Sequence, residues 1–159
     1  MKNTILIDFD GVIRHWSASE VEAQAKALGL SQNPLFACAF SREQSQPAIT
    51  GKISHETWFE NVEQALMRSH GQTVAQVLVS AWAEQQAEVD HLFLERIRAV
   101  SGARALVLVT NATSRLEEDL KALKLTQAFD RIMNSAVLGL AKPDTRFFDR
   151  VLEQLEITP

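Results

Sequence analysis

The sequence has little of the residue types that mark disordered, disulfide-rich or repetitive chains. Its 159 residues include one cysteine, four prolines and six glycines. Cys38 cannot form an internal disulfide or a zinc site of several cysteines, which fits a reducing compartment, and we expect it to be a small buried apolar residue. With 46% hydrophobic and 23% charged residues, the composition excludes collagen-like and disordered chains and is typical of a globular protein.

Long hydrophobic runs and an excess of positive charge are also missing. No stretch approaches the ~18 apolar residues of a membrane span, and the N-terminal run Ile5-Leu6-Ile7 is too short for a signal peptide. Sixteen Lys and Arg against twenty Asp and Glu give a net charge of −4, so no global field would attract nucleic acid or an anionic membrane. We therefore expect a cytoplasmic protein with no nucleic-acid or membrane partner.

Hydrophobic patterning predicts an α/β fold. The runs Ile5-Leu6-Ile7 and Leu106-Val107-Leu108-Val109 are continuous rather than alternating, as in strands buried on both faces of a parallel sheet. A weaker third strand is predicted over residues 131–135. Polar residues follow the first two runs directly, and in open α/β sheets ligands bind at the carboxyl ends of the strands.

A long helical insertion follows the first predicted strand. Residues from about 15 to 85 show helical periodicity and no strand signal, apart from a break at 31–34 and a polar loop at 41–51. We therefore expect a βα core over residues 1–14 and 86–159 with an all-helical cap over 15–85, for which 159 residues suffice. Four helices are expected to begin at side-chain caps: Ser17 with Glu20, Ser54, Ser114 with Glu117, and Asp144.

The sharpest feature is the acidic pair in Asp8-Phe9-Asp10-Gly11-Val12, directly after the first predicted strand. Residues i and i+2 of a strand point to the same face, so the two carboxylates should project together, and Gly11 permits the turn that follows. Two close like charges repel unless a cation or a shared proton compensates them, and Mg²⁺ with its preference for oxygen ligands is the natural compensator. An ordinary acidic turn after a strand is the alternative.

Two further groups of polar residues are predicted at the same edge of the sheet. Thr110 and Asn111 follow the second strand, where a hydroxyl and a backbone N–H can hold phosphoryl oxygens, although they could equally cap a helix. Lys142, before Pro143, could place an ammonium against a phosphoryl group and Asp8, or it could be a solvated surface lysine. Together the three groups are hard to explain as separate accidents.

These motifs resemble those of the haloacid dehalogenase-like (HAD) hydrolase superfamily, in the branch with a helical cap inserted after the first strand. Asp8-Phe9-Asp10-Gly11-Val12 looks like the first motif, Val109-Thr110-Asn111-Ala112 like the second, and Lys142-Pro143-Asp144 like the third. Their order, separation and strand context match over essentially the whole chain. The resemblance implies a Rossmann-like core and a Mg²⁺-dependent phosphatase that acts on a small phosphorylated metabolite.

The resemblance also implies a role for each matching residue. Asp8 would be the nucleophile that forms an aspartyl phosphate, and Asp10 the group that protonates the leaving oxygen and then activates water. The Asp8 carboxylate and the Asp10 backbone carbonyl would hold Mg²⁺, while Thr110, Asn111 and Lys142 bind the phosphoryl group. Asp10 also favours phosphoryl transfer over dehalogenation, because the dehalogenase branch lacks an acid at that position.

One motif of the family is not found. The fourth motif, one or two acidic residues after a further strand, should follow the last predicted helix, but the sequence stops at Ile157-Thr158-Pro159, and Asp130, Asp144 and Asp149 do not fit the role. We therefore expect a core without its last strand, a weakened metal site, and an exposed edge on residues 5–7 that could pair with a second copy of the chain. A fragment or shortened relative of a phosphatase is one explanation, and a degenerate member that binds phosphate ligands or a protein partner with little turnover is the other.

Several residues carry weaker signals. Arg14, His15 and Trp16 follow the first motif, where the chain should leave the core, so they are either substrate-facing or a hinge with an aromatic packing anchor. Three histidines without metal-ligand spacing are expected to face solvent: His55, His70 and His91. Two tryptophans are expected to pack the cap rather than to hold a cofactor: Trp58 and Trp82.

Overall fold

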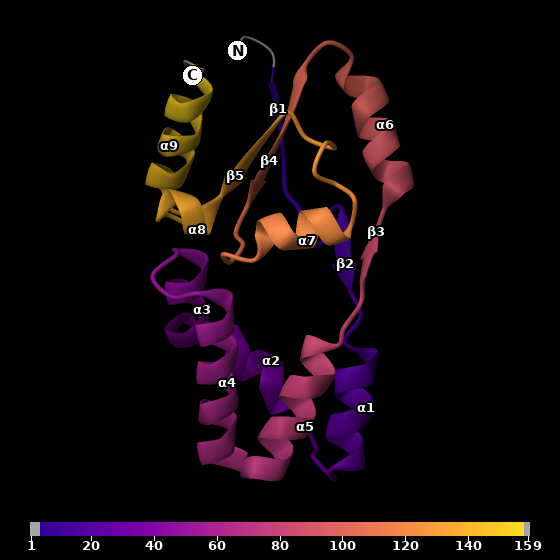
Figure 1. Cartoon of the computed structure of the whole chain (residues 1–159), viewed down its shortest axis with the longest axis vertical. Helices are drawn as coiled ribbons and strands as arrows, with labels where there is room; N and C mark the ends of the chain where they lie inside the picture. Colours follow the sequence, from indigo (N-terminus) through magenta and orange to yellow (C-terminus); the bar gives the residue numbers. More distant parts are fainter. Residues whose placement is uncertain (1–3, 158–159) are drawn as a thin grey trace.

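The core of the chain is a three-stranded parallel sheet. The computed structural model describes residues 4–157, in which the strands run in the order β1-β4-β5 with both neighbouring pairs parallel. The strands are β1 (Thr4–Ile7), β4 (Ala105–Thr110) and β5 (Arg131–Asn134). Ile7 lies beside Leu108 and Thr110 beside Asn134, so the carboxyl ends of the strands share one edge (Figure 1). This arrangement confirms the predicted α/β fold with a parallel sheet.

Helices cover both faces of this sheet because β4 is apolar on both sides. The core helices are α6 (His91–Ser101), α7 (Leu116–Ala122), α8 (Ser135–Leu138) and α9 (Thr145–Leu155). Leu106 and Leu108 join one buried cluster with residues of α6 and α7, whereas Val107 and Val109 join another with residues of α9. Removing this apolar surface from water, at about 25 cal/mol per Å², is what holds the layers together.

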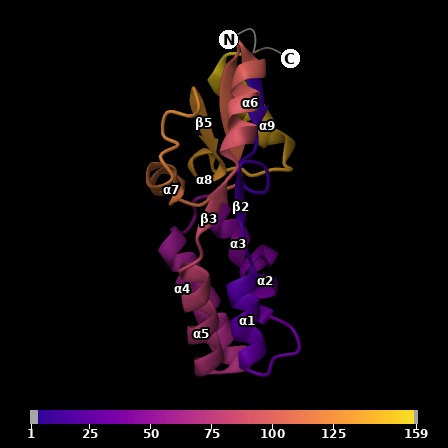
Figure 2. The same cartoon turned by 90° about the vertical axis from the view of Figure 1, so that its right-hand side faces the viewer.

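The helical insertion forms a separate hydrophobic cluster of its own, at the opposite end of the molecule from α6 and α9 (Figures 1 and 2). Its helices in the described part of the chain are α1 (Ser19–Ala27), α2 (Pro34–Ala39), α3 (Arg42–Ile49), α4 (His55–His70) and α5 (Gln72–Ala83). α4 and α5 run in opposite directions and are joined at Gly71, whose φ of 87° favours glycine. Val62 and Leu66 of α4 and Leu78 of α5 are almost fully buried between the helices.

Two short strands connect the core to the helical insertion. β2 (Arg14–Trp16) and β3 (Ala87–Val89) pair antiparallel, and they lie at the waist of the molecule (Figure 2). The expectation of no strand between residues 15 and 85 is therefore wrong at its first two positions. A strand of three residues is too short to show a hydrophobic period in the sequence. β2 forms because β3 supplies its hydrogen-bond partners, and β3 forms for the same reason.

Two of the four predicted helix caps are confirmed. Ser54 and Asp144 each accept a hydrogen bond from a backbone N–H of the first helical turn, at 3.1 and 3.0 Å. The capping boxes predicted at Ser17 and Ser114 are wrong, because α1 and α7 begin two residues later without a side-chain cap bond. Ser114 instead uses its hydroxyl to accept a hydrogen bond from the backbone of His55, in the helical insertion.

The polar loop predicted over residues 41–51 is also wrong, because most of it is helix α3. Ser41 caps this helix by accepting a hydrogen bond from the backbone N–H of Gln44 at 3.4 Å. Ala48 is its buried residue, and the other positions are mainly polar. A short, exposed helix of this kind has too few apolar positions to produce a helical period in the sequence.

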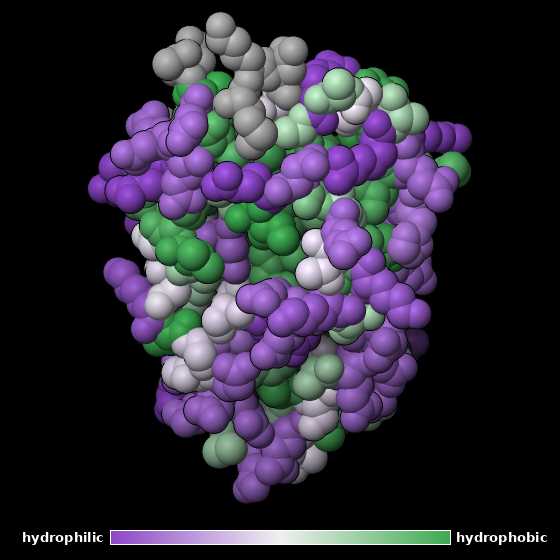
Figure 3. All heavy atoms as spheres, turned by 45° about the horizontal axis from the view of Figure 1, so that its top comes forward, coloured by the Kyte–Doolittle hydropathy of each residue, from purple (hydrophilic) through white to green (hydrophobic). Residues whose placement is uncertain are grey.

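β1 lies at an edge of the sheet formed by residues 4–157. Leu6 of this strand is 40% exposed. On the face of the molecule shown in Figure 3, hydrophobic patches interrupt a mainly hydrophilic surface. Three expectations stay predictions: that the core lacks its last strand, that this edge pairs with a second copy of the chain, and that the domain boundaries lie at residues 14 and 86. Among the same residues no helix is both long and apolar enough to cross a bilayer, and the cytoplasmic location also stays a prediction.

Candidate functional site

The three predicted motifs meet at the carboxyl edge of the sheet. Asp8 follows β1 directly, Thr110 ends β4, and Lys142 lies in the loop between α8 and α9. The Lys142 ammonium lies 2.6 Å from Oδ2 of Asp8 and also donates to the main-chain oxygen of Val109 at 3.1 Å. Only 22% of the Lys142 side chain is exposed, so it is a member of the site and not a solvated surface lysine.

Asn111 holds the Lys142 loop against the end of β4. Its Nδ2 donates to the main-chain oxygen of Lys142 at 2.9 Å, and its Oδ1 accepts from the main-chain nitrogen of Lys142 at 2.8 Å. Both ends of the amide are therefore engaged in positioning Lys142. Thr110, which precedes Asn111, is 1% exposed at the same edge.

A tight loop after β1 folds Arg14 back onto Asp10. Three successive backbone N–H groups of the loop donate to the Phe9 oxygen, at 3.2, 2.8 and 2.9 Å. Gly11 has a φ of 79°, which residues with a Cβ rarely adopt. Arg14 then donates to both carboxylate oxygens of Asp10, from Nε at 2.7 Å and from Nη2 at 2.9 Å. The indole nitrogen of Trp16 donates to Oδ1 of the same carboxylate at 2.8 Å.

The two carboxylates after β1 are therefore compensated separately. Asp8 pairs with Lys142, and Asp10 pairs with Arg14. The sequence interpretation named a cation or a shared proton, with Mg²⁺ as the natural choice, and it placed Lys142 against Asp8; the contact of Lys142 is present, and the pairing of Arg14 with Asp10 was not predicted. The reason is the loop geometry, which brings Arg14 beside a carboxylate only four positions earlier in the chain.

Arg14 extends this pairing to helix α7. Its Nη1 lies 2.7 Å from Oδ2 of Asp119, and Asp119 in turn accepts from Nε of Arg115 at 2.9 Å. Burial opposes the charge on Arg14, but the hydrogen bonds and negative charges of Asp10 and Asp119 outweigh it and raise the pKa of the guanidinium. Alternating charges thus run from Asp10 to Arg115 across the floor of the site.

His55 attaches the helical insertion to this charged floor. Its ring nitrogens lie 3.0 Å from the Thr113 hydroxyl and 3.0 Å from Nη1 of Arg115. A guanidinium only donates, so Nε2 accepts from Arg115 and the proton of the neutral ring sits on Nδ1, from which it is donated to Thr113. Burial and the charge of Arg115 lower the pKa of His55 to about 4. The expectation that His55 faces solvent is wrong, because the first turn of α4 packs on the core.

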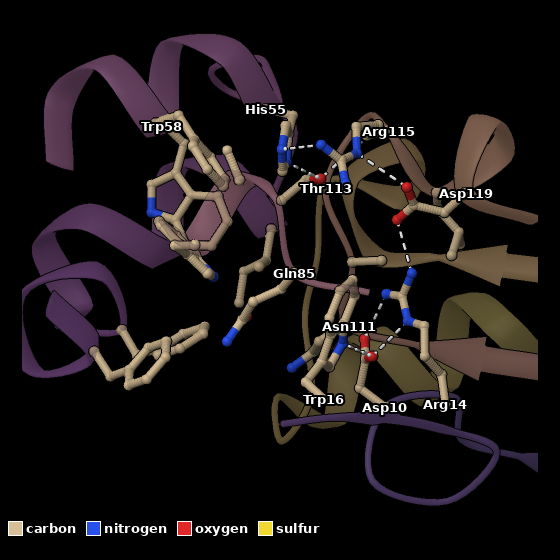
Figure 4. Close-up of a pocket in the computed structure, with 18 of the residues that line it drawn as sticks. Asp10, Arg14, Trp16, His55, Trp58, Gln85, Asn111, Thr113, Arg115 and Asp119 are labelled. Carbon is tan, nitrogen blue, oxygen red and sulfur yellow. Dashed lines mark hydrogen bonds and ion pairs between the residues drawn. The ribbon is translucent and has the colours of Figure 1, made fainter. Parts of the chain in front are cut away.

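A cavity of about 490 Å³ lies between the charged floor and the helical insertion. Asp10, Asn111 and Arg115 line it on the core side, and aromatic side chains line it on the other (Figure 4). Trp58 and Trp82 belong to this aromatic lining. Their predicted packing role is confirmed by the hydrophobic cluster that they share, and they also face the cavity.

The three residues that follow the first motif, 14–16, do not all lie in the cavity. Arg14 and Trp16 line the cavity, whereas His15 is exposed, pairs in register with Glu88 and is absent from the described lining. Alternation along β2 explains the difference, because neighbouring strand residues point to opposite faces. His15 therefore lies outside this cavity, and its predicted substrate-facing role gains no support here.

The sequence interpretation missed several residues that line the cavity: His55, Gln85, Thr113, Arg115 and Asp119. Two of them were within reach of sequence reasoning, because Thr113 and Arg115 follow the second motif in the same loop at the carboxyl end of β4. His55 had no such signal. It contacts this loop only because the fold brings together residues 58 positions apart.

A magnesium ion finds oxygen donors here, but few. Among residues 4–157 no group of three or more His, Cys, Asp or Glu side chains is arranged to hold a metal. The Asp8 carboxylate and the Asp10 backbone carbonyl are donors of the type that Mg²⁺ prefers, and Mg²⁺ commonly takes its remaining ligands from water and phosphate. These donors therefore fit a Mg²⁺ ion that takes some of its remaining ligands from the phosphate group of a bound substrate.

The chain was compared with protein-family models and with the sequences of known proteins. No protein-family model matches the chain. The chain is similar to the haloacid dehalogenase-like hydrolase domain-containing protein 3 of Bos taurus, with 26% identity over 150 residues. The match covers 89% of this chain but only 60% of the length of that relative.

Solved structures of HAD enzymes share the fold. A HAD family enzyme from Bacteroides thetaiotaomicron, in complex with magnesium and inorganic phosphate, matches with a TM-score of 0.69 at 15% identity, over 99% of this chain and 80% of that one. A dehalogenase in an intermediate complex matches with a TM-score of 0.66 at 21% identity, over 99% and 73% of the two chains. These structures show that the chain has the fold of haloacid dehalogenase-like hydrolases, and the relative in sequence carries the same description.

Proposed function

We propose that this chain is a Mg²⁺-dependent phosphatase that hydrolyses a small phosphorylated metabolite through an aspartyl phosphate on Asp8. The observation that carries the proposal is the contact between Lys142 Nζ and Asp8 Oδ2, at 2.6 Å, beside Asp10 and Thr110 at the carboxyl edge of the sheet. A carboxylate nucleophile, a fixed ammonium and a second carboxylate are the groups that phosphoryl transfer to an aspartate requires.

Asp8 is the nucleophile in this proposal. Its Oδ1 accepts from the backbone N–H of Phe9 at 2.9 Å and its Oδ2 pairs with Lys142, yet 42% of the side chain is exposed. The carboxylate is thus oriented and still accessible to a phosphoryl group. An attack by one Asp8 oxygen on phosphorus forms the acyl phosphate, and the bond from phosphorus to the leaving oxygen breaks. Lys142 and the Thr110 hydroxyl then stabilise the charge on the phosphoryl oxygens.

Asp10 is the acid and base in this proposal. It gives a proton to the leaving oxygen and then takes one from the water that attacks the acyl phosphate. In the free site both of its oxygens accept hydrogen bonds from Arg14, and one also accepts from Trp16. Asp10 must therefore release one of these donors before it can carry the proton, and Arg14 is a positioning residue for this step.

Magnesium would be held by the Asp8 carboxylate and the Asp10 backbone carbonyl. A bound divalent cation neutralises charge on the phosphoryl oxygens and so lowers the barrier to attack by an anionic nucleophile. Because the described residues offer no third carboxylate at this place, we expect the ion to bind weakly unless phosphate is present. The helical insertion would serve as the cap that closes the site over the substrate.

Phosphatase assays with and without Mg²⁺, beside an Asp8→Asn variant, test the proposal. We expect turnover of a generic phosphate ester to need the metal and to fall by at least about a thousandfold in the variant, since the nucleophile is removed. Turnover that is unchanged without Mg²⁺ and in Asp8→Asn would contradict the proposal. The same preparation offered a haloacid tests the chemistry of the dehalogenase branch, which the acid at Asp10 disfavours.

A second candidate is a protein that binds phosphate ligands or a protein partner with little turnover. The hold of Arg14 on Asp10 favours it, because both carboxylate oxygens of Asp10 already accept hydrogen bonds from the guanidinium. Binding of fluoroberyllate, a mimic of the aspartyl phosphate, separates the two candidates. Metal-dependent fluoroberyllate binding without turnover supports the second, and binding with turnover supports the phosphatase.

A further inference from the structure

The cavity is much larger than a phosphoryl group requires. Its volume of about 490 Å³ falls within the ~300–1,000 Å³ typical of sites for drug-sized ligands. Asp10 and Asn111 line its core end, whereas Asp8, Thr110 and Lys142 lie outside the described lining (Figure 4). In the proposed reaction the phosphoryl group lies at Asp8, beside this end, so the cavity itself is available for the remainder of the ligand.

The far wall of the cavity is made of aromatic rings in fixed arrangement. Phe59 and Trp82 are stacked with their centroids 4.0 Å apart and their planes 12° from parallel. Trp58 stands edge-on to both, at 5.6 and 5.1 Å. Phe40 also lines the cavity but is 61% exposed. Such a wall offers ring faces and edges to a further ring, which aromatic groups prefer at centroid separations of about 4.5–7 Å.

This wall carries no charge. All cavity-lining residues that the structure describes between positions 18 and 85 are uncharged, and apart from indole nitrogens the polar ones are His55 and Gln85. Both ring nitrogens of His55 are engaged with the core, and Nε2 of Gln85 donates to the Ser17 oxygen at 2.7 Å. A carboxylate, an ammonium or a second phosphate placed here would lose its water and find few partners besides the Gln85 amide.

Trp16 lies at the junction of the two ends. Its nitrogen donates to Asp10 at 2.8 Å, its ring lies 4.8 Å from the Arg14 guanidinium, and 43% of the residue remains exposed (Figure 4). A ligand whose phosphoryl group reaches Asp8 therefore passes an aromatic face before it meets the aromatic wall.

From these observations we propose that the cavity selects phosphate monoesters whose alcohol part is a flat, uncharged aromatic group, held between Trp16 and the wall of Phe40, Phe59 and Trp82. This substrate class rests on the proposed phosphatase function. Sugar phosphates and bisphosphates are disfavoured, because their hydroxyl groups and second charges find few partners on the aromatic wall. Ring recognition itself does not require turnover, so the two proposals can be tested apart.

The test compares two esters with alkoxide leaving groups, so that their intrinsic reactivity is similar. We expect kcat/KM for naphthylmethyl phosphate to exceed that for glycerol phosphate by about 10- to 100-fold, since the ring buries apolar surface against the wall and glycerol does not. Phe40→Ala should raise KM for the naphthylmethyl ester about 3- to 10-fold and change KM for glycerol phosphate by clearly less. Phe40 is chosen because its exposure makes its truncation easy for the fold to tolerate.

Phe148→Ala is the matched control, since Phe148 is a partly exposed phenylalanine of α9 outside the cavity lining, and neither ester should respond to it. Equal kcat/KM values for the two esters, or an equal loss of both in Phe40→Ala, would overturn the proposal. Calorimetry with naphthylmethylphosphonate, which cannot be hydrolysed, gives the independent readout. If neither ester turns over but this phosphonate binds at least tenfold more tightly than methylphosphonate, the phosphatase function fails and the ring site stands; equal affinities overturn the ring site.

Discussion

Arg14 and Asp119 lie 105 positions apart in the sequence, yet Nη1 of one is 2.7 Å from Oδ2 of the other. The same guanidinium holds both oxygens of Asp10, and only 6% of the Arg14 side chain is exposed. One buried cation therefore compensates two carboxylates, one after β1 and one on α7. Through it the position of the proposed acid depends on the packing of a helix that follows the second motif.

Arg14→Met is expected to lower the free energy of unfolding by about 2–4 kcal/mol, because it leaves two neighbouring carboxylates without their shared, buried partner. Urea denaturation measures this directly. Lys121→Met is the matched control, since Lys121 also pairs with a carboxylate, Glu117, but both side chains are more than half exposed. Its effect should be much smaller, because an ion pair between exposed side chains contributes little to stability. Equal losses in the two variants would show that burial of the Arg14 pair adds nothing.

His55 makes the attachment of the helical insertion sensitive to acid. Its pKa of about 4 in the folded chain lies below the ordinary 6.5, so between these values the unfolded chain takes up a proton that the folded one does not. The contribution of His55 to stability is therefore complete above about pH 6.5 and declines as the pH falls towards 4. We expect a loss of about 1 kcal/mol, because the partly exposed ring is screened by solvent.

His55→Gln should remove this part of the pH dependence, as measured by urea unfolding at several values between pH 4 and 7. His70→Gln, at the exposed C-terminal end of the same helix, is the matched control for the loss of one imidazole. Identical profiles for the two variants would contradict the assignment of the acid sensitivity to His55.

Lys142→Met is expected to reduce phosphatase activity by about 100- to 1,000-fold with little change in stability. The ammonium 2.6 Å from Asp8 is positioned to stabilise charge that develops on the phosphoryl group, and the loss of one such donor costs that much in comparable sites. Steady-state kinetics, with circular dichroism as the check on folding, measure it. Lys121→Met serves again as the control, and a drop of less than tenfold in Lys142→Met would place the ammonium outside the reaction.

Gly51→Ala should loosen the contact between α3 and the core. Gly51 has a φ of 69°, and a Cβ built there would overlap the main-chain oxygen of Ala136 in α8. Gly29 has a similar φ of 76° but open space around it, so Gly29→Ala carries the backbone strain without the overlap. We expect Gly51→Ala to lower the free energy of unfolding by at least about 1 kcal/mol more than Gly29→Ala. An equal loss of unfolding free energy in the two variants would mean that α3 can move away from α8 without cost to stability.

Several parts of the fold were predictable because their causes are local. The continuous apolar run that becomes β4 can only be buried on both faces, and its polar end at Thr110 and Asn111 marks the edge of the sheet where Asp8 and Lys142 also lie. The caps at Ser54 and Asp144 depend on backbone groups within three residues. β2 was not predictable in this way, because its hydrogen bonds come from a segment more than 70 positions later.

The sequence by itself determined the family motifs, their order and the sheet edge at which they meet, because hydrophobic period and short-range capping record those features. Only the tertiary structure decided which cation compensates each carboxylate, how His55 attaches the helical insertion, and that the rings of Phe59 and Trp82 face the same cavity as Asp10. Most of these contacts join residues that are tens of positions apart, although Arg14 and Asp10 are only four apart. Their energies depend on geometry and burial, which no local pattern in the chain encodes.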